Sequence, residues 1–150
     1  MNNREKFEDL TNKHKADVSA IMSKMIEALT SRMKRHDDSK LTEPEMSGFI
    51  KIAPELNGGK KISIDSQEYK DSIKISAVEE HYKNNDHHPE HFENGVEDMN
   101  LMQVTEMVAD WISASKRYDG VVNLEYQTER FKLDKQLMAI ISNTINNLKI

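Results

Sequence analysis

Histidine and aspartate gather in two short stretches of this 150-residue chain. The segment 81–91, HYKNNDHHPEH, holds four of the 6 histidines, and the segment 35–40, RHDDSK, holds a fifth beside two aspartates. Neutral imidazoles and carboxylates are the ligands that manganese, iron, zinc, cobalt and nickel take in proteins. The chain has no cysteine, so any metal must be held by nitrogen and oxygen atoms. The two stretches therefore predict a site for a divalent metal ion.

The candidate ligands are spread along most of the chain. In order they are His14, His36, Asp37, His81, His87, His88 and Asp110. Asp110 is included because it interrupts the apolar pattern of a helix, where an unpaired carboxylate would be costly, and a salt bridge to Arg117 is the alternative. The set is large enough for one or two ions, with Asp37 as a bridge. Two neighbouring ions can activate water and stabilise the leaving oxygen of a phosphate ester.

The elements that must position these residues are helical. Apolar residues recur at spacings of three and four, so the expected fold class is all-α. We expect a single domain over residues 1–150, built as a bundle of about six to seven helices. We predict helices at 3–29, 44–52, 66–83, 99–118 and 134–148. Residues 54–65 are predicted to form a loop, and residues 121–130 either a short helix or a loop.

The first candidate ligand imposes a demand on the N-terminal part. In one unbroken helix, His14 and His36 would lie about 33 Å apart at 1.5 Å per residue, too far to share an ion. We therefore predict a turn at Thr30-Ser31, where a hydroxyl side chain caps a second helix that starts near Arg32. The alternative for His14 is a histidine at the edge of the core with one hydrogen bond. His91 is expected to anchor its loop.

The order H…HD…H…H…D resembles the HD-domain superfamily of helical metal-dependent phosphohydrolases. On this resemblance, His14 matches the first histidine, His36 and Asp37 match the HD pair, and Asp110 matches the final aspartate. The histidines of 81–91 match the additional ligands of two-metal members. These are His81 and one or both of His87 and His88. The segments NDHHPEHF and EMVADW also resemble a small HD-like family of bacteria and phages.

The resemblance implies an HD-like helical fold and hydrolysis of a small phosphate ester, with a nucleotide as the expected substrate. HDDSK is similar to the HD-x-[SG]-[KE] form of the motif, which makes Lys40 a candidate contact either for the substrate phosphate or for a residue that binds the metal. Lys40 also replaces an acidic residue that activates water in some members. The base is therefore unassigned, with Asp38, Glu106 or a metal-bound hydroxide as candidates.

Two other functions fit the same residues. One is an HD-type di-iron oxygenase, which iron content and colour would reveal. The other is a protein that binds or sequesters a nucleotide without turnover, which the missing assignment of a base suggests.

Composition limits the partners. The net charge is −5 with both signs mixed along the chain, which argues against binding to a nucleic-acid polymer. No apolar run approaches the length of a membrane span, and the polar start MNNREKFEDL does not resemble a signal peptide. We expect a cytoplasmic protein without membrane contact, and a homodimer is left open.

Overall fold

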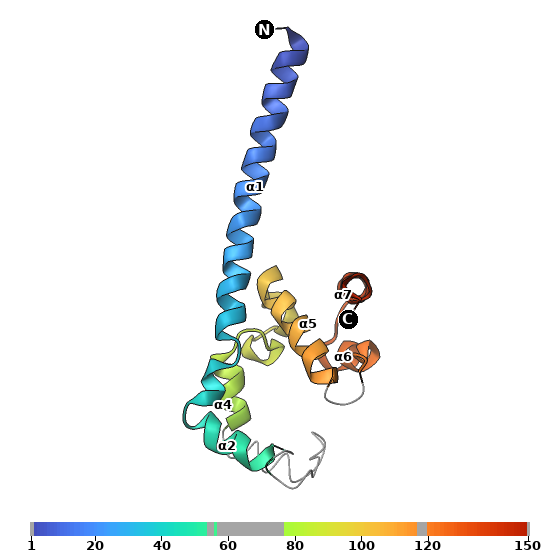
Figure 1. Ribbon diagram of the computed structural model, residues 1–150. Helices are drawn as coiled ribbons and strands as arrows, with labels where there is room; N and C mark the ends of the chain where they lie inside the picture. Colours follow the sequence, from blue (N-terminus) through green and yellow to red (C-terminus); the bar gives the residue numbers. More distant parts are fainter. Residues whose placement is uncertain (1, 54–55, 57–76, 117–119, 150) are drawn as a thin grey trace. The chain divides into compact units, whose positions relative to one another are not determined.

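The computed structural model describes residues 2–53, 56, 77–116 and 120–149. Within these residues the secondary structure is helical, with six α-helices, three 3-10 helices and no strand (Figure 1), which confirms the all-α prediction. The chain divides into two compact units, residues 1–35 and residues 36–150. The expectation of one domain over residues 1–150 stays a prediction.

The first unit is one helix, α1, Asn3–Arg35, of 33 residues. Asn2 caps its start: the Asn2 side chain accepts a hydrogen bond from the Glu5 amide at 2.9 Å, and the Glu5 carboxylate accepts one from the Asn2 amide at 2.7 Å. This reciprocal capping satisfies two amide groups that a helix start leaves without partners. No residue of α1 is buried.

The predicted turn at Thr30-Ser31 is wrong, because α1 runs through both residues. The Ser31 hydroxyl caps no new helix. Instead it accepts a hydrogen bond from the Arg35 guanidinium at 3.1 Å, one helical turn further on. A continuous helix from His14 to Arg35 is about 31 Å long at 1.5 Å per residue. His14 is therefore not brought to His36, the residue that follows the helix.

The second unit begins with η1, Asp38–Leu41, and α2, Glu45–Ile52, as the sequence predicts for 44–52. Helix α2 packs against α4, Ala77–Asn84, through Gly48. A Cβ atom at Gly48 would lie only 2.0 Å from the Cβ atom of Ala77, so only glycine permits this approach. Helix α4 is the second part of the helix predicted at 66–83. Its first part and most of the predicted loop at 54–65 lie outside the described residues.

The rest of the unit holds η2, Pro89–His91, η3, Gly95–Asp98, α5, Leu101–Lys116, α6, Leu124–Phe131, and α7, Lys135–Leu148. Its core contains five buried side chains: Met107, Val108, Ile112, Leu133 and Ile141. Helices α5 and α7 match the predictions at 99–118 and 134–148, apart from residues 117–118, which lie outside the described residues. The ambiguous segment 121–130 is helical from Leu124 on, and helix α6 ends one residue beyond it, at Phe131.

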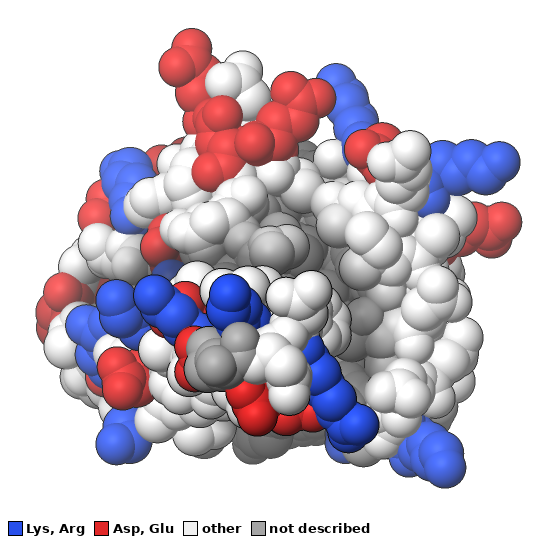
Figure 2. All heavy atoms as spheres, turned by 90° about the horizontal axis from the view of Figure 1, so that it is seen from above, with Lys and Arg blue, Asp and Glu red and all other residues white. Residues whose placement is uncertain are grey.

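The surface carries charges of both signs. On the face shown in Figure 2, lysine and arginine side chains are interspersed with aspartate and glutamate side chains. Among the described helices, none combines the length and the apolar character needed to cross a membrane.

Candidate metal centre

Polar side chains from distant parts of the second unit meet at one place, which we call the cluster. They come from the segment before η1, from α2, α4 and α5, and from the loop between α4 and η2. The members are His36, Asp37, Glu45, His81, His87, His88, Glu106 and Asp110. The cluster thus contains every predicted ligand except His14.

Four residues of the cluster present one ligand atom each within 4.8 Å of one another: Asp37, His81, His87 and His88. Asp37 Oδ1 lies 3.3 Å from Nε2 of His81 and 3.5 Å from Nε2 of His87. Nε2 of His81 lies 2.9 Å from Nε2 of His88. Ligand atoms placed 2.0–2.1 Å from a tetrahedral ion are separated by about 3.3 Å. The spacing is therefore that of atoms that could share a single metal ion.

Two of these ligand atoms have no hydrogen-bond partner. Asp37 Oδ1 and His87 Nε2 are both buried without one among the described residues. Buried polar atoms are nearly always hydrogen-bonded, because leaving one without a partner costs about 1–3 kcal/mol. A cation between the two atoms would satisfy both, so the residues present fit a metal ion.

Glu45 orients His81. Its carboxylate is 1% exposed and accepts hydrogen bonds from the Ser39 hydroxyl at 2.8 Å and the Asn84 amide at 2.9 Å. Burial alone would raise the pKa of Glu45, but bonds from Asn84, His81 and Ser39 hold that pKa below its usual value. Nδ1 of His81 lies 2.9 Å from this carboxylate. Because an ionised carboxylate only accepts, Nδ1 carries the hydrogen and Nε2 presents its lone pair to the cluster.

Glu106 has the same relation to His87 and His36. Its Oε1 atom lies 3.3 Å from Nδ1 of His87 and 2.8 Å from Nδ1 of His36. These three residues also lie close enough to be considered for a second ion. That reading would require His87 to bind metal through both ring nitrogens and so to lose its last ring hydrogen. We therefore assign hydrogen bonds from both histidines to Glu106, which leaves Nε2 of His87 free for an ion.

Asp37 and Lys40 form a pair at the edge of the cluster. Asp37 has a φ of 61°, in the left-handed region that aspartate enters more readily than most residues. Its Oδ2 atom accepts a bond from the Lys40 ammonium at 2.6 Å, so Oδ1 is the atom left facing the histidines. Burial would raise the pKa of Asp37, but the hydrogen bond and charge of Lys40 lower it. Asp37 is therefore an ionised ligand candidate with a fixed orientation.

The loop that carries His87 and His88 is held at several points. The Asn85 amide donates to the His81 carbonyl at 2.8 Å, and Gln103 of α5 donates to Asp86 at 2.6 Å. His91 donates from Nδ1 to the Tyr82 carbonyl at 2.9 Å, which confirms its predicted anchoring role. These bonds fix both ends of the segment between α4 and η2.

The histidines of the cluster differ in charge. Burial is the main cause that lowers the pKa values of His81, His87 and His88. For His88, the proximity of His87 and His81 lowers the pKa further, to about 3. In contrast, the nearby carboxylate of Asp110 outweighs burial and, with Glu106 and Asp37, raises the pKa of His36 to about 9. Three neutral imidazoles thus face one imidazolium.

The open side of the cluster is formed by charged residues. The side chains of His36 and Asp110 are 31% and 29% exposed, whereas those of His81 and His87 are 3% and 2% exposed. Nε2 of His36 lies 3.7 Å from Asp110 Oδ1. Burial would raise the pKa of Asp110, but the ion pair with His36 lowers it. Lys40, whose side chain is 36% exposed, lies beside Asp37, so His36, Asp110 and Lys40 form the more exposed part of the site.

The remaining predicted residues divide as follows. Glu106 belongs to the cluster, and Lys40 contacts it through Asp37. Asp38, the first residue of η1, is exposed and is not part of the cluster. Glu45 was not among the predicted site residues. Its signal in the sequence is weak: Gly48 and Phe49 follow it by three and four positions, which places all three on one face of α2.

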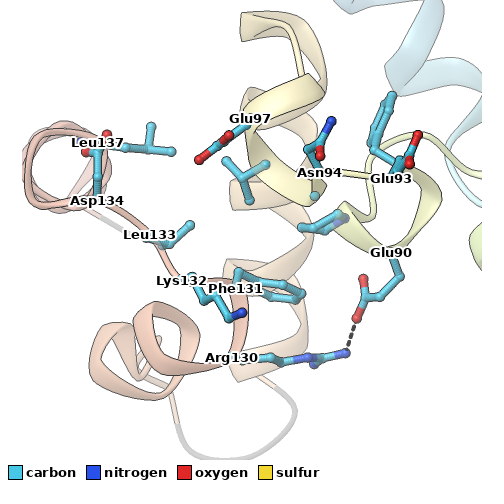
Figure 3. Close-up of a pocket in the computed structure, with 14 residues that line it drawn as sticks. Glu90, Glu93, Asn94, Glu97, Arg130, Phe131, Lys132, Leu133, Asp134 and Leu137 are labelled. Carbon is cyan, nitrogen blue, oxygen red and sulfur yellow. Dashed lines mark hydrogen bonds and ion pairs between the residues drawn. The ribbon is translucent and has the colours of Figure 1, made fainter.

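A separate cavity of about 580 Å³ lies between the η2–η3 segment and the turn from α6 to α7 (Figure 3). An ion pair of 2.7 Å joins Glu90 and Arg130 at one side of it. The lining mixes acidic residues such as Glu97 and Asp134 with apolar ones such as Leu137. None of the metal-ligand candidates lines this cavity.

One comparison with known proteins gave a match. The model of a family of unknown function, DUF5662, matches residues 3–147. No curated protein and no solved structure matches the chain.

Proposed function

The chain belongs to the DUF5662 family, and we propose that it is a metal-dependent phosphohydrolase with one divalent ion held by Asp37, His81, His87 and His88. The observation that carries the proposal is the pair of buried atoms without partners, Asp37 Oδ1 and His87 Nε2, beside two histidines held neutral. Three nitrogens and one carboxylate suit manganese, iron, zinc, cobalt or nickel. Such an ion, when bound, would lower the pKa of a coordinated water and so supply a hydroxide nucleophile.

The contacts of Asp37 with Lys40 and of His87 with Glu106 favour one ion over two. A second ion bridged by Asp37 would need its Oδ2 atom, which already binds the Lys40 ammonium at 2.6 Å. A second ion at His36 and Glu106 would need both ring nitrogens of His87. We therefore propose one ion, with His36 and Asp110 beside it rather than bound to it. We also propose that the site is related to that of HD-domain phosphohydrolases, because the order of its residues resembles theirs.

The residues on the open side support an anionic substrate. Lys40 and the His36 imidazolium place two positive groups there, and both can donate hydrogen bonds to phosphate oxygens. His36 keeps its ring fixed through the bond from Nδ1 to Glu106, and its Nε2 atom lies 3.7 Å from Asp110 Oδ1. In this position His36 can protonate the leaving oxygen of a phosphate ester, while Asp110 stabilises its charged form.

A second candidate function is supported by one observation. Glu106 is engaged by two histidines, and Asp38 is exposed outside the cluster. Neither carboxylate is placed to remove a proton from a nucleophile. A protein that binds a phosphorylated molecule without turnover would need the same metal and the same positive groups, but no base.

The test measures metal content and turnover in matched variants. The purified protein should hold about one ion per chain after loading with manganese, zinc or iron, and Asp37→Asn and His87→Gln should hold far less. Asp38→Asn and His14→Gln are the controls, because both residues lie outside the cluster, and both should retain the ion. Turnover is then followed with nucleotide mono- and triphosphates, cyclic nucleotides and p-nitrophenyl phosphate.

Three results would decide between the readings. Equal metal content in Asp37→Asn, His87→Gln and the unchanged protein would refute the site. Metal binding without turnover of any ester would favour the binding protein. Two iron atoms per chain would refute the one-ion arrangement and favour the di-iron oxygenase.

A further inference from the structure

Helix α1 carries an apolar stripe along one side, and no described residue of the first unit covers it. Its large apolar side chains lie at spacings of three, four and seven, and at 100° per residue they fall within an arc of about 160°. The exposed fractions run from 38% to 72% for the members of the stripe: Phe7, Leu10, Val18, Ile21, Met22, Met25, Ile26 and Met33.

The area of this stripe is large for a protein that acts alone. If each large side chain offers about 200 Å², the stripe exposes on the order of 900 Å². The largest apolar patch on a typical monomer measures about 300–600 Å², and larger patches mark interaction sites. A stable interface buries about 800 Å² on each partner. The stripe therefore has the size of one side of a stable protein interface.

The form of α1 indicates what covers the stripe. Its 33 residues contain no glycine or proline, and a helical pattern longer than about 25 residues is typical of paired helices. A long exposed helix gains most of its stability from packing of its apolar face. A second copy of the chain offers a stripe of identical length and character, and identical surfaces on two copies form a two-fold interface.

We propose that α1 pairs through this stripe with α1 of a second copy of the chain. The segment from Val18 to Leu29 lies at the centre of the contact, because apolar residues are densest there. Ile21 and Met25 lie near the middle of the length of the stripe, 61% and 38% exposed in a single chain. The opposite face holds Ala16 and Ser23, about half a turn away at 100° per residue.

The test is the mass of the full-length protein in solution between about 1 and 100 µM, measured by sedimentation equilibrium. The unchanged protein should sediment at twice the chain mass of 17.3 kDa. The variant Ile21→Lys/Met25→Lys should weaken the dimer at least about 100-fold, because two charges would enter an apolar contact. The variant Ala16→Lys/Ser23→Lys adds the same charge on the opposite face and should dimerise like the unchanged protein.

Helix content, measured by circular dichroism, shows whether each variant folds, and Ile21→Ala/Met25→Ala repeats the test without added charge. Another apolar surface could dimerise instead: the groove between α5 and α7, where Ile140 is 61% exposed. Three outcomes would overturn the proposal. They are a monomer over the whole concentration range, a dimer of unchanged affinity in Ile21→Lys/Met25→Lys, and loss of the dimer in Ile140→Lys.

Discussion

The substitution Glu45→Gln tests the support of the proposed metal site without changing any of its proposed ligands. The Glu45 side chain is buried at 1% exposure and accepts bonds from Ser39, His81 and Asn84. Glutamine has nearly the same volume, but its NH₂ group is a donor and would face side chains that donate to the Glu45 carboxylate. Bonds to a charged acceptor contribute about 1.5–3 kcal/mol each, so we expect the free energy of unfolding to fall by about 3 kcal/mol.

The same change should act on metal binding. Without an ionised acceptor at Nδ1, His81 no longer has its hydrogen fixed on that nitrogen, and Nε2 loses its defined lone pair. Loss of such a partner typically weakens metal affinity about 10- to 100-fold. The assays are urea unfolding of the metal-free protein and a competition titration with a chelator of known affinity.

Glu43→Gln is the matched control. Glu43 is exposed and accepts a hydrogen bond from the hydroxyl of the nearby Ser47 at 2.6 Å, so neither quantity should change by more than a few tenths of a kcal/mol. The reasoning would be refuted if Glu45→Gln lost stability but bound metal with unchanged affinity. In that case the contact between Glu45 and His81 would serve the fold alone.

Three further predictions concern pH and packing. The pKa of His36 is raised from 6.5 to about 9 on folding, so its contribution is complete below pH 6.5 and is lost as the pH rises through 9. Urea unfolding in the presence of a chelator should show a loss of at most about 3 kcal/mol over this range, and His36→Gln should remove that loss. His81, His87 and His88 are held neutral, so zinc binding at pH 6 should release fewer protons than the roughly two expected from three free imidazoles, as measured by calorimetry in buffers of different ionisation enthalpy. Gly48→Ala should cost about 1–3 kcal/mol by urea unfolding because its new Cβ would meet Ala77, and a second change that shortens Ala77 to glycine should restore part of the loss.

The sequence could predict the elements whose patterns are local. Helices α5 and α7 follow from apolar residues at spacings of three and four, and α2 follows from Pro44 and the acids at its start. His81, His87 and His88 could be found because they lie within a few positions of one another. Asp110 could be found because a carboxylate interrupts an apolar face.

The sequence could not predict contacts that depend on how helices pack. Glu45 reaches His81 across 36 positions, and nothing near Glu45 shows that its face of α2 is buried against α4. The prediction of a turn at Thr30-Ser31 was wrong because it relied on a weak local signal. A hydroxyl side chain is a weak capping signal, and it was required to bring His14 to the other ligands. Without glycine or proline the helix continues, and Ser31 bonds within it.

The left-handed backbone at Asp37 makes two requirements of a single residue. Alanine there would lose the carboxylate and would also pay about 1–2 kcal/mol for its Cβ atom in this conformation. Asparagine accepts the same backbone but brings no charge, and glycine accepts it without any side chain. Aspartate alone meets both needs, so a replacement at Asp37 should recover either the negative charge or the relaxed backbone, but not both.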